Sequence, residues 1–109
     1  MKVTNWDDAI VAKPSNKGLA ISKCTEDIYV QDIETKFGIG MTIGSVPPNE
    51  DHACIQNVQF KNVKMNYPIK GIYVKSNPGN HGDGLIKNIS YEGISMQNAI
   101  WWPIYIGPQ

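Results

Sequence analysis

The sequence predicts an all-β fold, a right-handed parallel β-helix in which about three to four short coils stack on one another. Three observations support this prediction: a segment that recurs along the chain, apolar residues that alternate within each copy, and turn-forming residues between the copies. The copies are Cys24-Thr-Glu-Asp-Ile-Tyr-Val, Cys54-Ile-Gln-Asn-Val-Gln-Phe and Leu85-Ile-Lys-Asn-Ile-Ser-Tyr. Cys24 and Cys54 are 30 residues apart, and Leu85 follows Cys54 by 31 residues.

Apolar residues occupy every second position within each copy. They are Ile28 and Val30 in the first copy, Val58 and Phe60 in the second, and Ile89 and Tyr91 in the third. This period, rich in β-branched residues, predicts strands, and the glycine, proline, asparagine and aspartate residues around it predict turns. One copy cannot bury its own apolar face, whereas copies stacked at the roughly 4.8 Å strand spacing bury a continuous core. Leucine-rich repeats and helical solenoids have other patterns, which this sequence lacks.

The repeat predicts a single partial domain over residues 1–109. It contains a partial coil at 5–23 and coils near 24–53, 54–84 and 85–109. A later strand of each coil is expected at Ala9-Ile-Val-Ala-Lys, Met41-Thr-Ile-Gly-Ser, Ile72-Tyr-Val-Lys-Ser and Ile104-Tyr-Ile-Gly-Pro. Because neither end of the sequence resembles a cap for the open strand edges, we expect a piece of a longer solenoid.

These later strands predict which side chains form columns. Ala9, Met41 and Ile72 are expected to point inward. The expected outward columns are Asp8, Gly40 and Gly71, then Ile10, Thr42 and Tyr73, then Ala12, Gly44 and Lys75. Glycine and alanine in two of these columns surround a carboxylate and a lysine, so the sequence predicts a groove with exposed backbone.

Cys24 and Cys54 are expected in one column on neighbouring coils. Their Cα atoms would then lie within the roughly 4.4 to 6.8 Å that a disulfide needs. A bridge and a pair of stacked, buried thiols are both compatible with this placement. Two cysteines alone do not define the redox compartment.

Composition excludes several classes of function. Ten basic residues, all lysine, balance ten acidic residues, so the chain offers no basic field to a nucleic acid and no polybasic stretch to an anionic membrane. No apolar run approaches the roughly 20 residues that span a bilayer. His52 and His81 lie in polar segments and lack partners at ligand spacing, so the sequence predicts no metal and no other cofactor.

Asp7 and Asp8 are the candidate catalytic groups. Paired carboxylates suit glycosidic cleavage, in which one protonated acid donates to the leaving oxygen and a second carboxylate activates water. Adjacent strand residues face opposite sides, so both can reach the groove only at a turn or bulge, which the Asn5-Trp6 segment permits. An isolated Asp-Asp pair is more often a solvated turn. The expected stacking near Gly40 and Lys75 favours a site.

Trp101 and Trp102 lie in the last coil, and Trp102 is expected in the column of Lys70 and Ile39. One indole ring could form a platform for a sugar at the end of the groove. Packing against a further coil is the alternative interpretation.

Three segments resemble motifs of glycoside hydrolase family 28, the polygalacturonases, whose fold is a pectin-lyase-like parallel β-helix. The segments are Trp6-Asp7-Asp8-Ala9, then Gly38-Ile39-Gly40 with Ile43-Gly44-Ser45, then Tyr73-Val74-Lys75. The family has Gly-Asp-Asp-Cys, Gly-His-Gly with Ile-Gly-Ser, and Arg-Ile-Lys at these places. Ile39 therefore stands where the family has histidine, and Tyr73 where it has arginine.

The resemblance implies an extracellular, monomeric hydrolase of a pectic or other uronic-acid-containing polysaccharide, which inverts the anomeric centre and needs no metal. It implies that Asp7 is the general acid, that Asp8 helps to activate water, and that Lys75 binds a substrate carboxylate. Tyr73, Gly40, Ser45 and Trp102 are the further expected substrate-binding residues. A non-catalytic β-helix that binds carbohydrate or serves a structural role remains the alternative.

Overall fold

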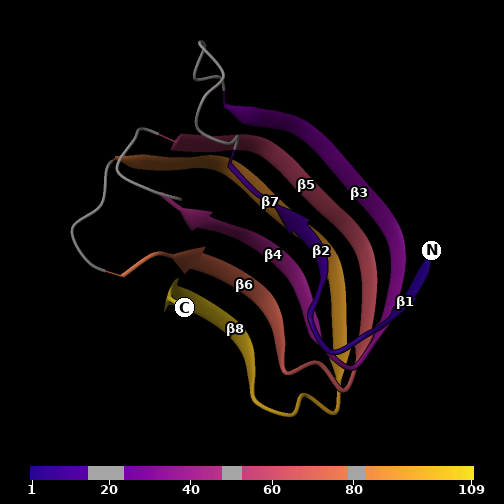
Figure 1. The fold of residues 1–109 in the computed structure, drawn as a ribbon. Coiled ribbons are helices and arrows are strands. Elements are labelled where there is room, and N and C mark those ends of the chain that lie inside the picture. Colours follow the sequence, from indigo (N-terminus) through magenta and orange to yellow (C-terminus); the bar gives the residue numbers. More distant parts are fainter. Residues whose placement is uncertain (15–23, 48–52, 79–82) are drawn as a thin grey trace.

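The computed structural model describes residues 1–14, 24–47, 53–78 and 83–109, which form two four-stranded parallel sheets (Figure 1). The first, which we call the long-strand sheet, contains β1 (Lys2–Thr4), β3 (Thr25–Lys36), β5 (Ala53–Asn66) and β7 (Gly84–Gln97). The second, the short-strand sheet, contains β2 (Asp8–Ala12), β4 (Ile39–Val46), β6 (Lys70–Ser76) and β8 (Trp102–Pro108). Strands of the two sheets alternate along the chain, so each coil adds one strand to each sheet. The predicted all-β parallel β-helix is confirmed.

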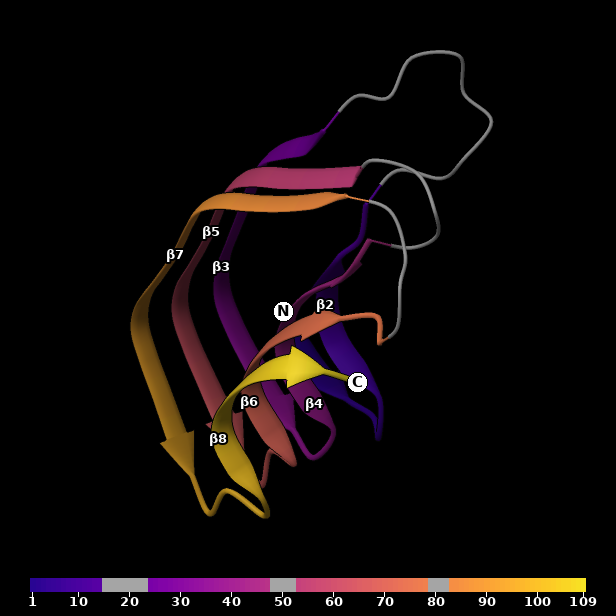
Figure 2. The ribbon, with the colours of Figure 1, turned by 90° about the vertical axis from the view of Figure 1, so that its left-hand side faces the viewer.

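The copies of the repeat stack in the predicted register in the long-strand sheet. One column is Ile28, Val58 and Ile89, and the next column of the same face is Val30, Phe60 and Tyr91. The long strands bend around one side of each coil, and the short strands lie across from them (Figure 2). The core lies between the sheets, where Met41, Ile43, Ile55, Phe60 and Val63 are each 0% exposed. Within the described ranges, no helix is long and apolar enough to cross a membrane.

The bends of the long strands occur at residues with positive φ, and these residues also form columns. Asp27, Asn57 and Asn88 have φ values of 60°, 55° and 55°. Asparagine and aspartate tolerate this left-handed region better than other residues with a Cβ atom. Asn57 Nδ2 donates to Asp27 Oδ1 at 3.2 Å, and Asn88 Nδ2 donates to Asn57 Oδ1 at 2.7 Å. The side-chain ladder therefore satisfies the polar groups at the bend and holds the coils in register.

A disulfide joins Cys24 to Cys54, with a Cα–Cα distance of 4.6 Å. The two thiols are therefore bonded, which decides between the alternatives that the sequence left open. The bridge connects the starts of two successive coils and closes a loop with a sequence separation of 30 residues.

The predicted columns of the short-strand sheet need a correction of one residue in the first coil. Ile10, not Ala9, pairs with Met41, and Asp8 pairs with Ile39. The shift arises at the bend of Trp6 and Asp7 that leads into β2, where counting with a period of two fails. Val11 therefore joins Thr42 and Tyr73 in one outward column, as Ile10 was expected to do.

The prediction that Gly40 and Gly71 form an outward column with Asp8 is wrong. Both glycines are buried, and a Cβ atom on Gly40 would overlap Met65 Sδ and the carbonyl oxygen of Gly71. A Cβ atom on Gly71 would overlap Met96 Sδ. These glycines therefore let the methionines of the long-strand sheet approach the short strands. Ala12, also predicted outward, is 4% exposed and belongs to the core.

Replacing both cysteines, in the Cys24→Ala/Cys54→Ala variant, is expected to lower the free energy of unfolding by about 3 to 4 kcal/mol. The bridge restricts the unfolded chain, and this is the size of the effect for a loop of this length in the chain-entropy model. Urea denaturation followed by circular dichroism measures the change. A loss below about 1 kcal/mol would contradict the contribution assigned to the bridge.

Candidate active site

The turn that presents Asp7 and Asp8 is fixed by three hydrogen bonds. Asp8 N donates to Asp7 Oδ1 at 2.7 Å, and Asn5 Nδ2 donates to the carbonyl oxygen of Asp8 at 3.2 Å. From the next coil, Ile39 N donates to the carbonyl oxygen of Asp7 at 2.9 Å. Gly38 makes this close approach feasible: its φ is +71°, and a Cβ atom there would lie 2.6 Å from Asn5 Oδ1.

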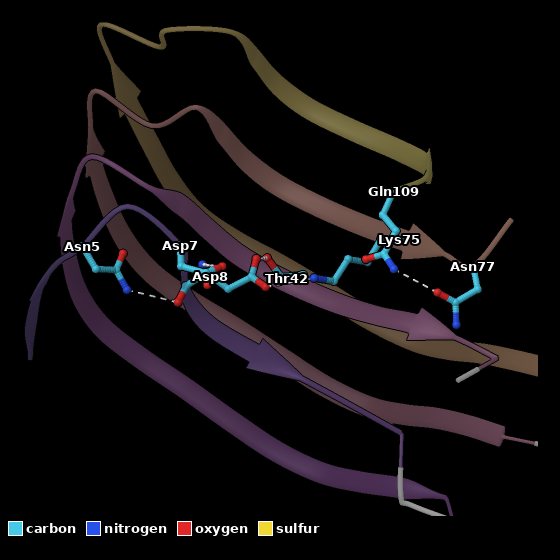
Figure 3. A network of polar contacts seen from close by, with 7 residues as sticks. All are labelled: Asn5, Asp7, Asp8, Thr42, Lys75, Asn77 and Gln109. Atoms are coloured by element: carbon cyan, nitrogen blue, oxygen red, sulfur yellow. Dashed lines mark hydrogen bonds and ion pairs between the residues drawn. The ribbon is translucent and has the colours of Figure 1, made fainter. Parts of the chain in front are cut away.

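Asp8 is held by side chains from two further coils (Figure 3). Thr42 Oγ1, on β4, donates to Asp8 Oδ1 at 2.5 Å, and Lys75 Nζ, on β6, donates to Oδ2 at 2.9 Å. The side chains of Lys75 and Asp8 are only 13% and 11% exposed. Both charged groups are thus largely removed from water, and the attraction between them offsets the cost of losing their hydration.

Tyr73 lies beside this ion pair and is 3% exposed. Its ring centroid is 5.5 Å from Lys75 Nζ. Burial raises the pKa of the Tyr73 phenol, Lys75 opposes this shift, and Asp8 adds to it. The phenol is therefore protonated at neutral pH and carries no charge where it adjoins the carboxylates.

The two carboxylates have different environments. Asp7 is exposed to solvent and Asp8 is partly buried in the ion pair. This difference suits a division of roles, since an acid must meet the substrate while the second carboxylate must be held in place. The arrangement therefore provides one accessible and one enclosed carboxylate, which are the two kinds of group that acid–base chemistry uses.

A surface pocket of about 280 Å³ continues from Lys75 toward the ends of the short strands. It is lined by Lys13, Pro14, Gly44, Ser45, Lys75, Asn77 and Gln109. Gly44 has a φ of +110°, and a Cβ atom there would overlap the Lys75 carbonyl oxygen and lie 3.1 Å from Lys75 Cγ. Glycine at this position therefore lets Lys75 reach Asp8 along the pocket wall.

The structure brings together four of the predicted site residues and separates two others. Asp7, Asp8, Tyr73 and Lys75 lie together, and Ser45 lines the adjoining pocket with Lys75. Gly40 faces the core. Trp102 lies in the predicted column: it pairs with Lys70, and Lys70 pairs with Ile39. Trp102 is 44% exposed.

Sequence reasoning did not identify Thr42 as a partner of Asp8, or Lys13, Asn77 and Gln109 as pocket residues. The sequence did contain evidence for the contact of Thr42, because this residue was expected in the outward column of Tyr73 and its hydroxyl group can donate a hydrogen bond. The other three lie at strand ends, where no periodic pattern indicates which way a side chain points.

No cluster of three or more histidine, cysteine or acidic side chains suited to a metal ion occurs among residues 1–14, 24–47, 53–78 and 83–109. His52 and His81, the residues considered above, lie outside the described ranges.

The fold is a parallel β-helix that carries two adjacent aspartates, Asp7 and Asp8, at the start of a strand of the short-strand sheet. The sequence profile of Glycosyl hydrolases family 28 matches residues 2–109. The chain belongs to this family, as the three motifs predicted.

Several curated polygalacturonase-type proteins are similar to the chain. An endopolygalacturonase of Emericella nidulans is 34% identical over 105 residues, which are 96% of this chain and 24% of that protein. A polygalacturonase of Gossypium barbadense is 27% identical over 97 residues, 89% of this chain and 23% of that protein. A probable endo-xylogalacturonan hydrolase of Emericella nidulans is 28% identical over 99 residues, 89% of this chain and 22% of that protein. The chain thus spans less than a quarter of the length of these relatives. No solved structure gave a significant match.

The Lys75→Met substitution is expected to lower the free energy of unfolding by about 3 to 5 kcal/mol, because it leaves the Asp8 carboxylate with little water and no cation. Adding Asp8→Asn should recover at least about 1 kcal/mol of this loss, since the unpaired charge is then removed. Urea denaturation of the wild type, both single variants and the double variant measures the coupling.

Lys2→Met is the matched control. Lys2 pairs with Glu34 at 3.8 Å, but these side chains are 84% and 54% exposed. This substitution should cost less than about 1 kcal/mol. Equal losses for Lys75→Met and Lys2→Met would contradict the importance given to the inner pair.

Proposed function

We propose that this chain supplies the acid–base site of a hydrolase that cleaves glycosidic bonds in a pectic or other uronic-acid-containing polysaccharide, with inversion of the anomeric centre. The observation that supports it most is the placement of Asp7 and Asp8 side by side at the entry to β2. There Lys75, from β6 two coils further on, contacts Asp8, and Tyr73 lies beside Lys75. The family and its polygalacturonase members support the substrate class.

Asp7 is the proposed general acid. Its Oδ1 accepts the Asp8 amide, and no other hydrogen bond to the Asp7 carboxyl group occurs among the described residues. Oδ2 is therefore the oxygen that can carry a proton to the leaving group. The side chain is exposed, so a bound polysaccharide can reach it.

Asp8 is the proposed water-activating carboxylate. Its oxygens accept one hydrogen bond each, from Thr42 and Lys75. A carboxylate has about four lone-pair positions, so each oxygen can still accept a water proton. The Thr42 and Lys75 contacts then fix the direction in which this water is held.

Lys75 can hold Asp8 and a substrate carboxylate at the same time. An ammonium group has three donors, and Asp8 takes one of them. Lys75 also lines the pocket that contains Gly44 and Ser45, where a substrate carboxylate could accept one of the remaining donors. Tyr73 stands where the family has arginine, and its buried, neutral ring lies beside Lys75, so the site offers a substrate carboxylate no bidentate fork at this position.

A non-catalytic carbohydrate-binding module is the second candidate. The observations that favour it are the Asp8–Lys75 ion pair, which engages the proposed base, and Ile39, an aliphatic side chain in register with Asp8. The same surface would then bind the polysaccharide without cleaving it. The Cys24–Cys54 disulfide suits an extracellular location in either case.

Reducing-sugar release from polygalacturonan, xylogalacturonan and rhamnogalacturonan by the full-length protein tests the proposal. Asp7→Asn is expected to lower kcat by about 10² to 10⁴ fold, because the amide cannot protonate the leaving oxygen. Glu92→Gln is the control: it makes the same chemical change at an exposed position of the long-strand sheet and should leave kcat unchanged.

No release from any of the three polysaccharides by the folded wild-type protein would transfer support to the binding module. Release that Asp7→Asn leaves intact would show that another group is the acid.

A further inference from the structure

The bend that leads into β2 is attached to the next coil by an aromatic stack. The ring of Trp6, the residue directly before Asp7, lies on the ring of Phe37 with a centroid distance of 4.6 Å and an interplanar angle of 16°. Trp6 is 68% exposed, so most of its surface faces solvent. The stack is therefore the contact that joins the indole to the neighbouring coil.

Phe37 adopts a backbone conformation that aromatic residues rarely take. Its φ is 63°, in the left-handed region, where a bulky side chain is an outlier and asparagine is tolerated. Phe37, Tyr67 and Asn98 occupy equivalent positions, because each is the first residue after its long strand. Tyr67 and Asn98 both have a φ of 56°. Asn98 shows that asparagine is sufficient to form this bend.

The other described residues with positive φ, apart from glycines and these two aromatic residues, are all aspartate or asparagine. A residue held in a strained conformation persists where its surroundings require it, and such residues cluster at functional sites. Asparagine at position 37 would suit the backbone better than phenylalanine, but it could not stack on an indole ring. The Phe37 ring therefore serves the contact with Trp6 rather than the bend itself.

Two further contacts hold the residues on either side of Trp6. Ile39 N donates to the carbonyl oxygen of Asp7 at 2.9 Å, and Gly38 lies closely against Asn5. The stack holds the residue between them through its side chain. All three contacts come from the segment between β3 and the start of β4, so the bend rests on one short piece of the next coil.

We propose that Phe37 is a positioning residue: its ring holds Trp6, and thereby keeps the adjacent Asp7 carboxyl group where it can protonate the leaving oxygen. The inference rests on the proposed function, because it explains how the proposed general acid is held in place. Phe37 itself touches no reacting atom and acts through Trp6.

Phe37→Asn separates positioning from folding, because it removes the ring and supplies a residue that suits positive φ. In reducing-sugar assays of the full-length protein, kcat should fall about tenfold while KM changes less than about twofold. A displaced acid slows the chemical step without weakening the binding of the polysaccharide. Phe37→Tyr keeps a ring and should retain kcat to within about twofold of the wild type.

Tyr67→Asn is the matched control. It makes the same exchange of an aromatic residue for asparagine at positive φ, one coil further on. The coil of Phe37 lies between Tyr67 and Trp6, so the stack on Trp6 stays in place. Urea denaturation should give similar midpoints for Tyr67→Asn and Phe37→Asn, whereas Tyr67→Asn should leave kcat unchanged.

Trp6→Leu removes the other ring of the stack. Because the two rings act as a unit, this variant should lose as much kcat as Phe37→Asn, and the double variant should be no slower than either single variant. Losses that multiply in the double variant would contradict the stack as their common cause.

Hydrogen exchange of the Asp8 amide reports the bend without any need for turnover. This amide donates to Asp7 Oδ1 at 2.7 Å, so its protection depends on the position of the Asp7 side chain. Mass spectrometry of the full-length protein should find the exchange about threefold faster in Phe37→Asn than in the wild type or in Tyr67→Asn.

An unchanged kcat in Phe37→Asn would overturn the positioning role, and so would unchanged exchange at Asp8. A raised KM with unchanged kcat would also overturn it, because the ring would then be a contact of the polysaccharide. Failure of the proposed function has a different signature: the wild-type protein would release no reducing sugar, while exchange at Asp8 would still be faster in Phe37→Asn.

Discussion

In-register stacking of parallel strands is the constraint on which the rest of the structure depends. It places residues about 31 positions apart at neighbouring points of adjacent coils, as in the pairs Val58 with Ile89 and Ile72 with Ile104. An apolar residue at an inward position of one coil is therefore matched by an apolar residue at the same position of the next. The apolar columns and the asparagine ladder along the bends are both consequences, and each in turn holds the register that produces it.

The candidate site uses the same constraint for a polar purpose. Thr42 and Lys75 are 34 and 67 residues from Asp8 in sequence, yet both contact it, because β2, β4 and β6 are consecutive strands of one sheet and the Lys75 side chain is long enough to reach past β4. The contacts leave Asp7 exposed and Asp8 enclosed. One turn thus presents two carboxylates with different surroundings, which is the physical requirement for dividing acid and base roles.

Periodicity was sufficient to predict the long-strand sheet, because its β-branched columns alternate without interruption from Ile28 to Val30 and from Val58 to Phe60. It failed for the first short strand, where the bend at Asp7, before Asp8, shifts the alternation by one residue.

Gly40 illustrates a second limit. A glycine can either leave backbone exposed in a groove or let another side chain pack closely against it, and only the position of Met65 on the opposite sheet shows that close packing is the reason here. The contact of Thr42 with Asp8 depends on side-chain directions across coils, which one-dimensional patterns do not contain.

A crystal structure of the Asp7→Asn protein with trigalacturonate tests most directly the central claim, that the outer face of the short-strand sheet is the polysaccharide site. The account predicts a sugar carboxylate within hydrogen-bonding distance of Lys75, about 2.7 to 3.2 Å, and a glycosidic oxygen next to the side chain at position 7. A trisaccharide bound instead at the bends of the long-strand sheet, among Asp27, Asn57 and Asn88, would contradict it.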